Sequence, residues 1–154
     1  MKVHSGVDAG SGYVHTITGT DASIHDSHET RKLIREDDEV LYGDSGYLGV
    51  MNRPEFQADK HLSSMEYRLN IRPSSIKMSK EYHGIRWDEE IENRKSSTRC
   101  KVEHPFLIVK RYFGYCKTAY RGIAENMNRF NILFASANLL MCIRAGRQEA
   151  FCMG

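Results

Sequence analysis

The sequence lacks the patterns by which several protein classes are recognised. Its 154 residues include four cysteines, none of them in a Cys-x-x-Cys pair, so a zinc site is not expected. It shows no secretory leader, and we expect free thiols in a reducing cytoplasm. Its longest apolar run, FNILFASANLLMCI at residues 130–143, is too short to span a bilayer. These absences favour a cytoplasmic protein of one globular domain, with no membrane segment and with the apolar run in its core.

Net charge is also small, at +2, and by itself does not indicate a nucleic-acid partner. Its distribution is uneven. Between Asp21 and Asp44 eight acids outnumber three bases, whereas between Arg94 and Arg121 eight bases accompany a single acid, Glu103. Five aromatic residues are interleaved with these bases, a mixture that phosphate contacts and base stacking use. A solvated basic face explains the same composition, so both interpretations stay open.

Local patterns predict a mixed α/β fold. Apolar and polar residues alternate on both sides of residues 9–12, which contain two glycines and predict a β-hairpin. Residues 29–36 predict a short helix capped by Asp26 or Ser27. A buried strand is expected to end at Asp44, and another is expected in residues 65–73, stopped by a proline.

Two longer helices are expected towards the C-terminus. The first covers residues 87–104, with Asp88 as its cap. Pro105 either kinks it or starts a new helix there. The second should be amphipathic, because apolar residues recur at spacings of three and four. That apolar face comprises Ile123, Met127, Phe130, Phe134, Ala137 and Met141.

Three charged residues share one predicted helix face. At roughly 100° per residue, Arg99, Glu103 and Lys110 fall within about 40° of one another, beside an apolar stripe of Val102, Phe106, Val109 and Phe113. A surface ion pair between Arg99 and Glu103 would explain the first two of these residues. It would stabilise the helix by only about a few tenths of a kcal/mol. A functional site explains all three, and spacing alone does not decide between the two.

Two longer stretches resemble the catalytic domain of DDE-type transposases of bacterial insertion sequences, specifically the insertion-sequence-five group. They are VLYGDSGYLG and the segment from RCKVEHPFLIVKRYFGYCK to the end of the apolar run. The group's signature is Tyr, two residues, Arg, three residues, Glu, six residues, Lys. Arg99, Glu103 and Lys110 match this spacing, while Ser96 stands at the Tyr position. The hairpin sequence GVDAGSGYVHTITGT is similar as well.

The resemblance implies a ribonuclease-H-like fold, a mixed sheet flanked by helices, and metal-dependent cutting and joining of DNA. It implies Asp44 and Glu103 as the second and third of three catalytic acids, binding Mg²⁺ or Mn²⁺. Two such ions, roughly 4 Å apart, stabilise the attacking and leaving oxygens in this chemistry, and hard cations prefer carboxylate ligands. Arg99, Lys110, Arg111 and Lys101 are then expected to bind DNA, both transposon ends and target.

The family's first catalytic Asp, on a strand before the hairpin, has no counterpart in the sequence. We therefore expect residues 1–146 to be the C-terminal portion of a catalytic domain that is incomplete at its N-terminal strand, with 147–154 as a tail. Such a truncated chain is expected to be nucleoid-associated and inactive alone. The alternative is a non-catalytic, DNA-binding or oligomer-forming remnant that associates and interferes with intact transposase.

Other candidate sites are weaker. His25, Asp26 and His28 lie close enough in sequence for metal ligands, but a capping role explains the acid. Asp8 aligns with the hairpin turn rather than with the missing acid. His104 beside Glu103 is better explained by packing or a DNA-facing position than by proton transfer.

Overall fold

The computed structural model describes residues 1–70 and 87–152, and its contacts divide the chain into two compact units. One comprises Met1–Ser23 and the chain from Lys101 onward, and is called the hairpin unit below. The other, Ile24–Cys100, is called the central unit. Both strands and helices are present, so the predicted α/β class is confirmed. The ribonuclease-H-like arrangement stays a prediction.

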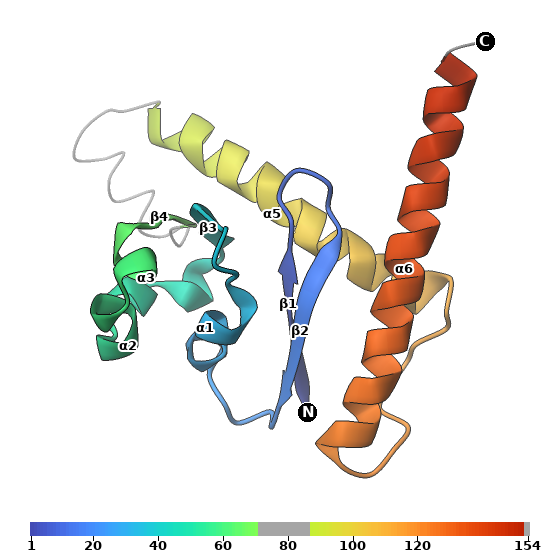
Figure 1. Ribbon diagram of the computed structural model, residues 1–154, viewed down its shortest axis with the longest axis horizontal. Coiled ribbons are helices and arrows are strands. Elements are labelled where there is room, and N and C mark those ends of the chain that lie inside the picture. The colour runs from blue at the N-terminus through green and yellow to red at the C-terminus, as the bar shows by residue number, and fades with distance from the viewer. Residues whose placement is uncertain (71–86, 153–154) are drawn as a thin grey trace. The chain divides into compact units, whose positions relative to one another are not determined.

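The hairpin unit begins with the predicted β-hairpin. β1 (Lys2–Val7) pairs antiparallel with β2 (Val14–Thr20), with Lys2 opposite Thr20 and a register shift between Gly6 and Val7 (Figure 1). The Asp8 carboxylate accepts hydrogen bonds of 2.6 Å from both the backbone N–H and the hydroxyl of Ser11. Gly12 adopts a φ of 78°, which glycine allows without strain. These local features close the turn where the sequence predicts it.

Two helices complete this unit. α5 (Trp87–Arg111) runs through Pro105 as one helix, so no new helix starts at the proline. Its residues from Lys101 onward belong to the hairpin unit. α6 (Ile123–Cys152) covers the predicted amphipathic segment and continues through residues 147–152, which the sequence assigned to a tail. Within the described ranges, no helix combines the length and apolar character that crossing a membrane requires.

The core of the hairpin unit lies between α5, α6 and the hairpin. Its buried residues are Ile108, Val109, Phe130, Phe134 and Ala137. Phe106 meets Phe134 edge to face at a centroid distance of 4.9 Å, a favoured aromatic geometry. The predicted apolar face of α6 is thus confirmed except at Ile123, which is 37% exposed at the helix start. Phe113 is also 37% exposed because α5 ends before it, at Arg111.

A side-chain amide of α6 forms hydrogen bonds to the hairpin backbone. The Asn138 amide accepts a hydrogen bond of 3.0 Å from the Val14 N–H and donates one of 2.7 Å to the Val14 carbonyl. Satisfying both backbone groups of Val14 in this way compensates for their partial burial. This amide therefore fixes the position of β2 along α6.

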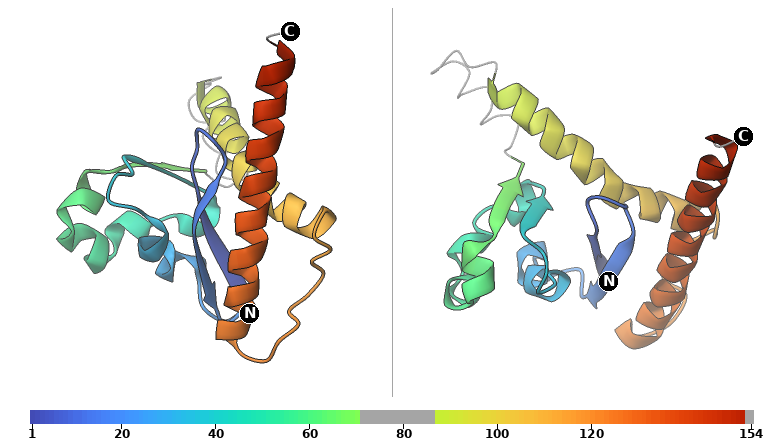
Figure 2. Two further views of the ribbon diagram at one scale, coloured as in Figure 1. Left: turned by 45° about the vertical axis from the view of Figure 1, so that its right-hand side comes forward. Right: turned by 45° about the horizontal axis from the view of Figure 1, so that its top comes forward.

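Among its described residues, the central unit contains a parallel strand pair, several short helices and the first part of α5, up to Cys100 (Figure 2). β3 (Val40–Gly43) pairs with β4 (Glu66–Leu69), with Val40 opposite Glu66. The short helices are η1 (Asp26–His28), α1 (Thr30–Leu33), η2 (Ser45–Tyr47), η3 (Val50–Asn52), α2 (Pro54–Ala58) and α3 (Lys60–Ser64). They bury Val50, Phe56 and Leu62 with Ile34 and Met65 in a second core.

Several sequence predictions in this unit need correction. The short helix forms as α1, but η1 precedes it, and the cap of η1 is His25, whose side chain accepts from the Ser27 N–H. Neither Asp26 nor Ser27 is the N-cap of these helices. The strand expected to be buried is only half-buried apart from Gly43, because within the described part of the chain β4 is the one strand that pairs with it. β4 confirms the next strand, whereas its predicted stop at Pro73 lies outside the described residues.

Candidate functional site

Asp44 lies immediately after β3. One of its carboxylate oxygens accepts a hydrogen bond of 2.9 Å from the Gly46 N–H, which makes Asp44 the N-cap of η2. The preceding Gly43 is buried, and a Cβ there would lie 2.9 Å from the Leu69 side chain. A strand end followed by a short capped turn therefore holds this half-buried carboxylate, as the sequence predicts.

Tyr47 reports on the electrostatics around Asp44. Burial raises the pKa of its phenol to about 12, and the negative charges of Asp26 and Asp44 contribute further. Both carboxylates therefore lie near this hydroxyl, which stays protonated at neutral pH. Sequence reasoning weighed Asp26 as a helix cap or, with His25 and His28, as a metal ligand, and did not connect it with Tyr47, since no spacing rule links residues so far apart.

Glu103 and the predicted DNA-binding lysines lie on the part of α5 that belongs to the hairpin unit. Glu103, Lys110 and Arg111 are exposed, and a separation of seven residues puts Glu103 and Lys110 on one side of a helix. Lys101 donates a 2.6 Å hydrogen bond to the Ala9 carbonyl of the hairpin turn. The side chain of Arg99 lies outside the described part of the chain.

Asp44 and Glu103 belong to different units. Each unit is described by itself, so a common cleft for the two carboxylates stays a prediction. Across residues 1–70 and 87–152, no set of three or more His, Cys, Asp or Glu side chains gathers as metal ligands.

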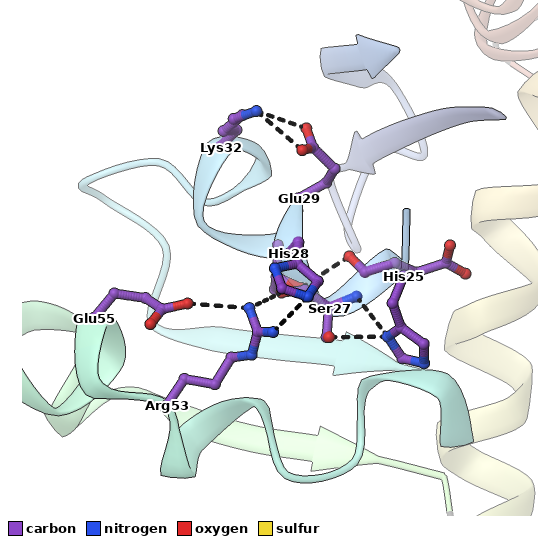
Figure 3. A network of polar contacts seen from close by, with 9 residues as sticks. His25, Ser27, His28, Glu29, Lys32, Arg53 and Glu55 are labelled. Atoms are coloured by element: carbon purple, nitrogen blue, oxygen red, sulfur yellow. Dashed lines mark hydrogen bonds and ion pairs between the residues drawn. The ribbon is translucent and has the colours of Figure 1, made fainter. Parts of the chain in front are cut away.

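The histidines near η1 take part in a hydrogen-bond network rather than in such a set (Figure 3). His25 Nδ1 lies 2.9 Å from the Ser27 hydroxyl, and His28 Nε2 lies 2.9 Å from an Arg53 guanidinium nitrogen. Arg53 also pairs with Glu55 at 3.0 Å. Because an arginine donor already occupies the ring nitrogen of His28, the metal interpretation of these histidines has no support here.

Aromatic and basic residues that follow α5 are exposed on the hairpin unit. Tyr112 is 52% exposed and Tyr120 is 55% exposed. Arg144 of α6 lies over the Tyr112 ring, with its guanidinium carbon 4.5 Å from the ring centroid. Sequence reasoning missed Arg144, since only the packing of α6 brings it beside residue 112.

Comparison with known families identifies the class of protein. The family model of the transposase DDE domain matches residues 1–139, and the chain belongs to this family. No solved structure matches the chain. Membership suggests a DNA transposase and implies DNA binding. DDE transposase domains generally depend on a divalent metal. The resemblance to DDE-type transposases is therefore confirmed, while the insertion-sequence-five group stays a prediction.

Proposed function

We propose that residues 1–154 belong to a DNA transposase of the insertion-sequence-five group, on a ribonuclease-H-like fold, and contribute Asp44 and Glu103 as metal ligands to its DNA cleavage and strand-transfer chemistry. The observation that carries the proposal is the family match over residues 1–139, combined with an acid directly after β3 and an exposed acid on α5. Mg²⁺ or Mn²⁺ is the expected cofactor.

The donor chemistry of the two residues fits such an ion. Both offer carboxylate oxygens, the ligands that hard divalent cations prefer. Asp44 is held at a strand end by its bond to the Gly46 N–H, which limits the freedom of the carboxylate before binding. When bound, the metal would supply stabilisation of the negative charge that develops on the reacting oxygens.

The basic residues near Glu103 have a different role. Arg99, Lys101, Lys110 and Arg111 would bind DNA phosphates and so position the substrate, without contributing metal ligands. Of these, Lys101 also bonds the hairpin turn, so part of its contribution would be structural.

We also propose that residues 1–154 alone do not cleave DNA at a measurable rate. Two carboxylates are an incomplete set for a mechanism that uses three, and the first acid of the resemblance has no counterpart here. Asp8 is a poor replacement, because its carboxylate already accepts two 2.6 Å hydrogen bonds from Ser11.

The ligand assignment is tested by Mn²⁺ binding, followed by electron paramagnetic resonance. We expect Asp44→Asn and Glu103→Gln each to weaken binding by at least about tenfold. If both residues bind the same ion, the double variant should lose less than the sum of the two single losses. Glu125→Gln, which removes another exposed glutamate, is the matched control and should bind normally. Unchanged binding in either ligand variant, with the fold intact, would contradict the assignment.

The activity proposal is tested with a DNA duplex carrying the element's ends, in Mg²⁺ or Mn²⁺. We expect no cleavage by residues 1–154. Cleavage that disappears in Glu103→Gln would show that another carboxylate completes the site, and Asp8→Asn would then identify or exclude Asp8.

A further inference from the structure

The helical part of the hairpin unit carries an excess of positive charge. Between His104 and Gln148 the sequence contains seven bases and one acid, Glu125. The bases are Lys110, Arg111, Lys117, Arg121, Arg129, Arg144 and Arg147. Within the described part of the chain, Arg111 and Arg144 form no ion pair. This surface therefore carries positive charge that no described carboxylate of the protein neutralises.

Two of these arginines converge on Tyr112, directly after α5. The Arg144 guanidinium lies 4.5 Å from the centre of the Tyr112 ring, a cation–π distance. A hydrogen bond with Arg144 and the charge of the adjacent Arg111 lower the pKa of Tyr112. The phenol is thus the shared neighbour of two cations that come from different helices.

Neither arginine has a described carboxylate as a partner, and the neutral Tyr112 phenol does not neutralise their charge. An oxyanion bound beside Tyr112 would be attracted by both charges. The contact with the Tyr112 ring also restricts the freedom of the exposed Arg144 side chain, so less conformational entropy is lost when its planar guanidinium binds an oxyanion.

We propose that Arg144 and Arg111 together bind a backbone phosphate of DNA, with Tyr112 as the positioning residue that holds Arg144. The proposal rests on the proposed function, because it takes DNA as the partner, and it extends the interface from α5 onto α6. DNA is favoured over a protein carboxylate because further bases, Lys110 and Lys117, are exposed along the same chain segment, and a polyanion can neutralise several of them together.

The test is the salt dependence of binding to a fluorescein-labelled 20-base-pair duplex, measured by anisotropy with EDTA present. For Arg144→Gln we expect the slope of log K against log salt to fall by about one, and the affinity to fall roughly tenfold at 0.1 M salt. Arg144→Lys keeps the charge but loses the planar guanidinium over the ring. Its affinity for the duplex should lie between those of the unsubstituted chain and Arg144→Gln.

Tyr112 is tested by a conservative pair. Tyr112→Phe keeps the ring under Arg144 and should bind nearly as well as the unsubstituted chain, whereas Tyr112→Ala should lose most of what Arg144→Gln loses. Equal losses of affinity in Tyr112→Phe and Tyr112→Ala would contradict the positioning role of the ring. Thermal unfolding of each variant checks that the fold persists.

Arg129→Gln is the matched control for charge. Arg129 lies on the same helix and over another tyrosine, Tyr115, at 5.5 Å, but it is half-buried. The proposal would be overturned if Arg129→Gln lost as much affinity for the duplex as Arg144→Gln, or if the salt slope were unchanged in Arg144→Gln. Failure of the unsubstituted chain to bind DNA at all would instead contradict the proposed function, so the two failures are distinguishable.

Discussion

The two units differ in which groups contact their basic side chains. In the central unit, bases pair with acids close in space, as in Arg31–Asp59 at 3.1 Å, Lys32–Glu29 at 2.9 Å and Arg68–Glu66 at 2.8 Å. In the hairpin unit, Arg129 and Arg144 lie over tyrosine rings and form no ion pair with a described acid, whereas Arg68 of the central unit combines a ring contact with its ion pair. A net charge of +2 thus conceals one unit in which several bases pair with acids and another with an excess of bases, which our proposal assigns to DNA binding.

The units also differ in how their cores are assembled. The core of the central unit joins residues of one continuous segment, Ile34 to Met65. The core of the hairpin unit joins α5 and α6 to a hairpin about a hundred residues earlier in the chain. A core of distant segments requires closure of a long loop, so the hairpin unit should depend more on each contact that holds its segments together.

The largest expected effects come from removing core side chains. Phe134→Ala in the hairpin unit should lower the free energy of unfolding by about 3–5 kcal/mol, and Leu62→Ala in the central unit by about 2–5 kcal/mol, since both side chains are buried. Amide hydrogen exchange should show protection lost chiefly in the unit that carries the substitution. Equal loss of exchange protection in both units would mean that they unfold together. The difference in core assembly would then have no effect on stability.

A smaller effect is expected at the connection between α6 and the hairpin. Asn138→Ala removes both side-chain bonds to Val14 and should lower the free energy of unfolding by about 1–3 kcal/mol, because the Val14 N–H and carbonyl lose their partner. Faster exchange of the Val14 amide would locate the effect. Asn128→Ala, at an exposed position of α6, should change neither quantity.

The charge comparison is sharpened by two lysines. Lys110→Ala should reduce the salt slope of DNA binding by about one, because exposed Lys110 is free to release a counterion from the DNA. Lys32→Ala, which removes a lysine paired with Glu29, should leave the slope unchanged. Identical salt slopes in the two variants would show that Lys110 contributes no more to DNA binding than Lys32 does.

The smallest effect at neutral pH is expected at Tyr47. Because the pKa of the folded phenol is raised to about 12 from an ordinary 10.0, the protonated form favours folding. Its contribution to stability is complete below pH 10 and is lost as pH rises towards 12. Tyr47→Phe should therefore flatten the fall in stability over that range while changing little at pH 7. Urea unfolding at pH 7 and at pH values between 10 and 12 measures this. The prediction is contradicted if Tyr47→Phe loses as much stability with rising pH as the unsubstituted chain.

Part of the candidate site could be predicted from local sequence. Asp44 follows β3 as predicted, because a short apolar run followed by Gly43, Ser45 and Gly46 specifies both the strand and its stop. Asp26 beside Tyr47 could not be predicted, because electrostatic proximity depends on how η1 packs against η2. The cap at His25 was missed for a related reason, as preference scales favour Asp and Ser at that position.

The sequence by itself determined the hairpin, the amphipathic face of α6, the basic segment after Glu103 and the resemblance that the family match bears out. Each of these depends on neighbours a few residues apart, so periodicity and turn chemistry suffice. Only the tertiary structure decided that Asn138 would hold Val14 and that Arg144 would lie on Tyr112. Those pairs join residues far apart in the chain, and packing of whole helices, rather than any local preference, sets which of them meet.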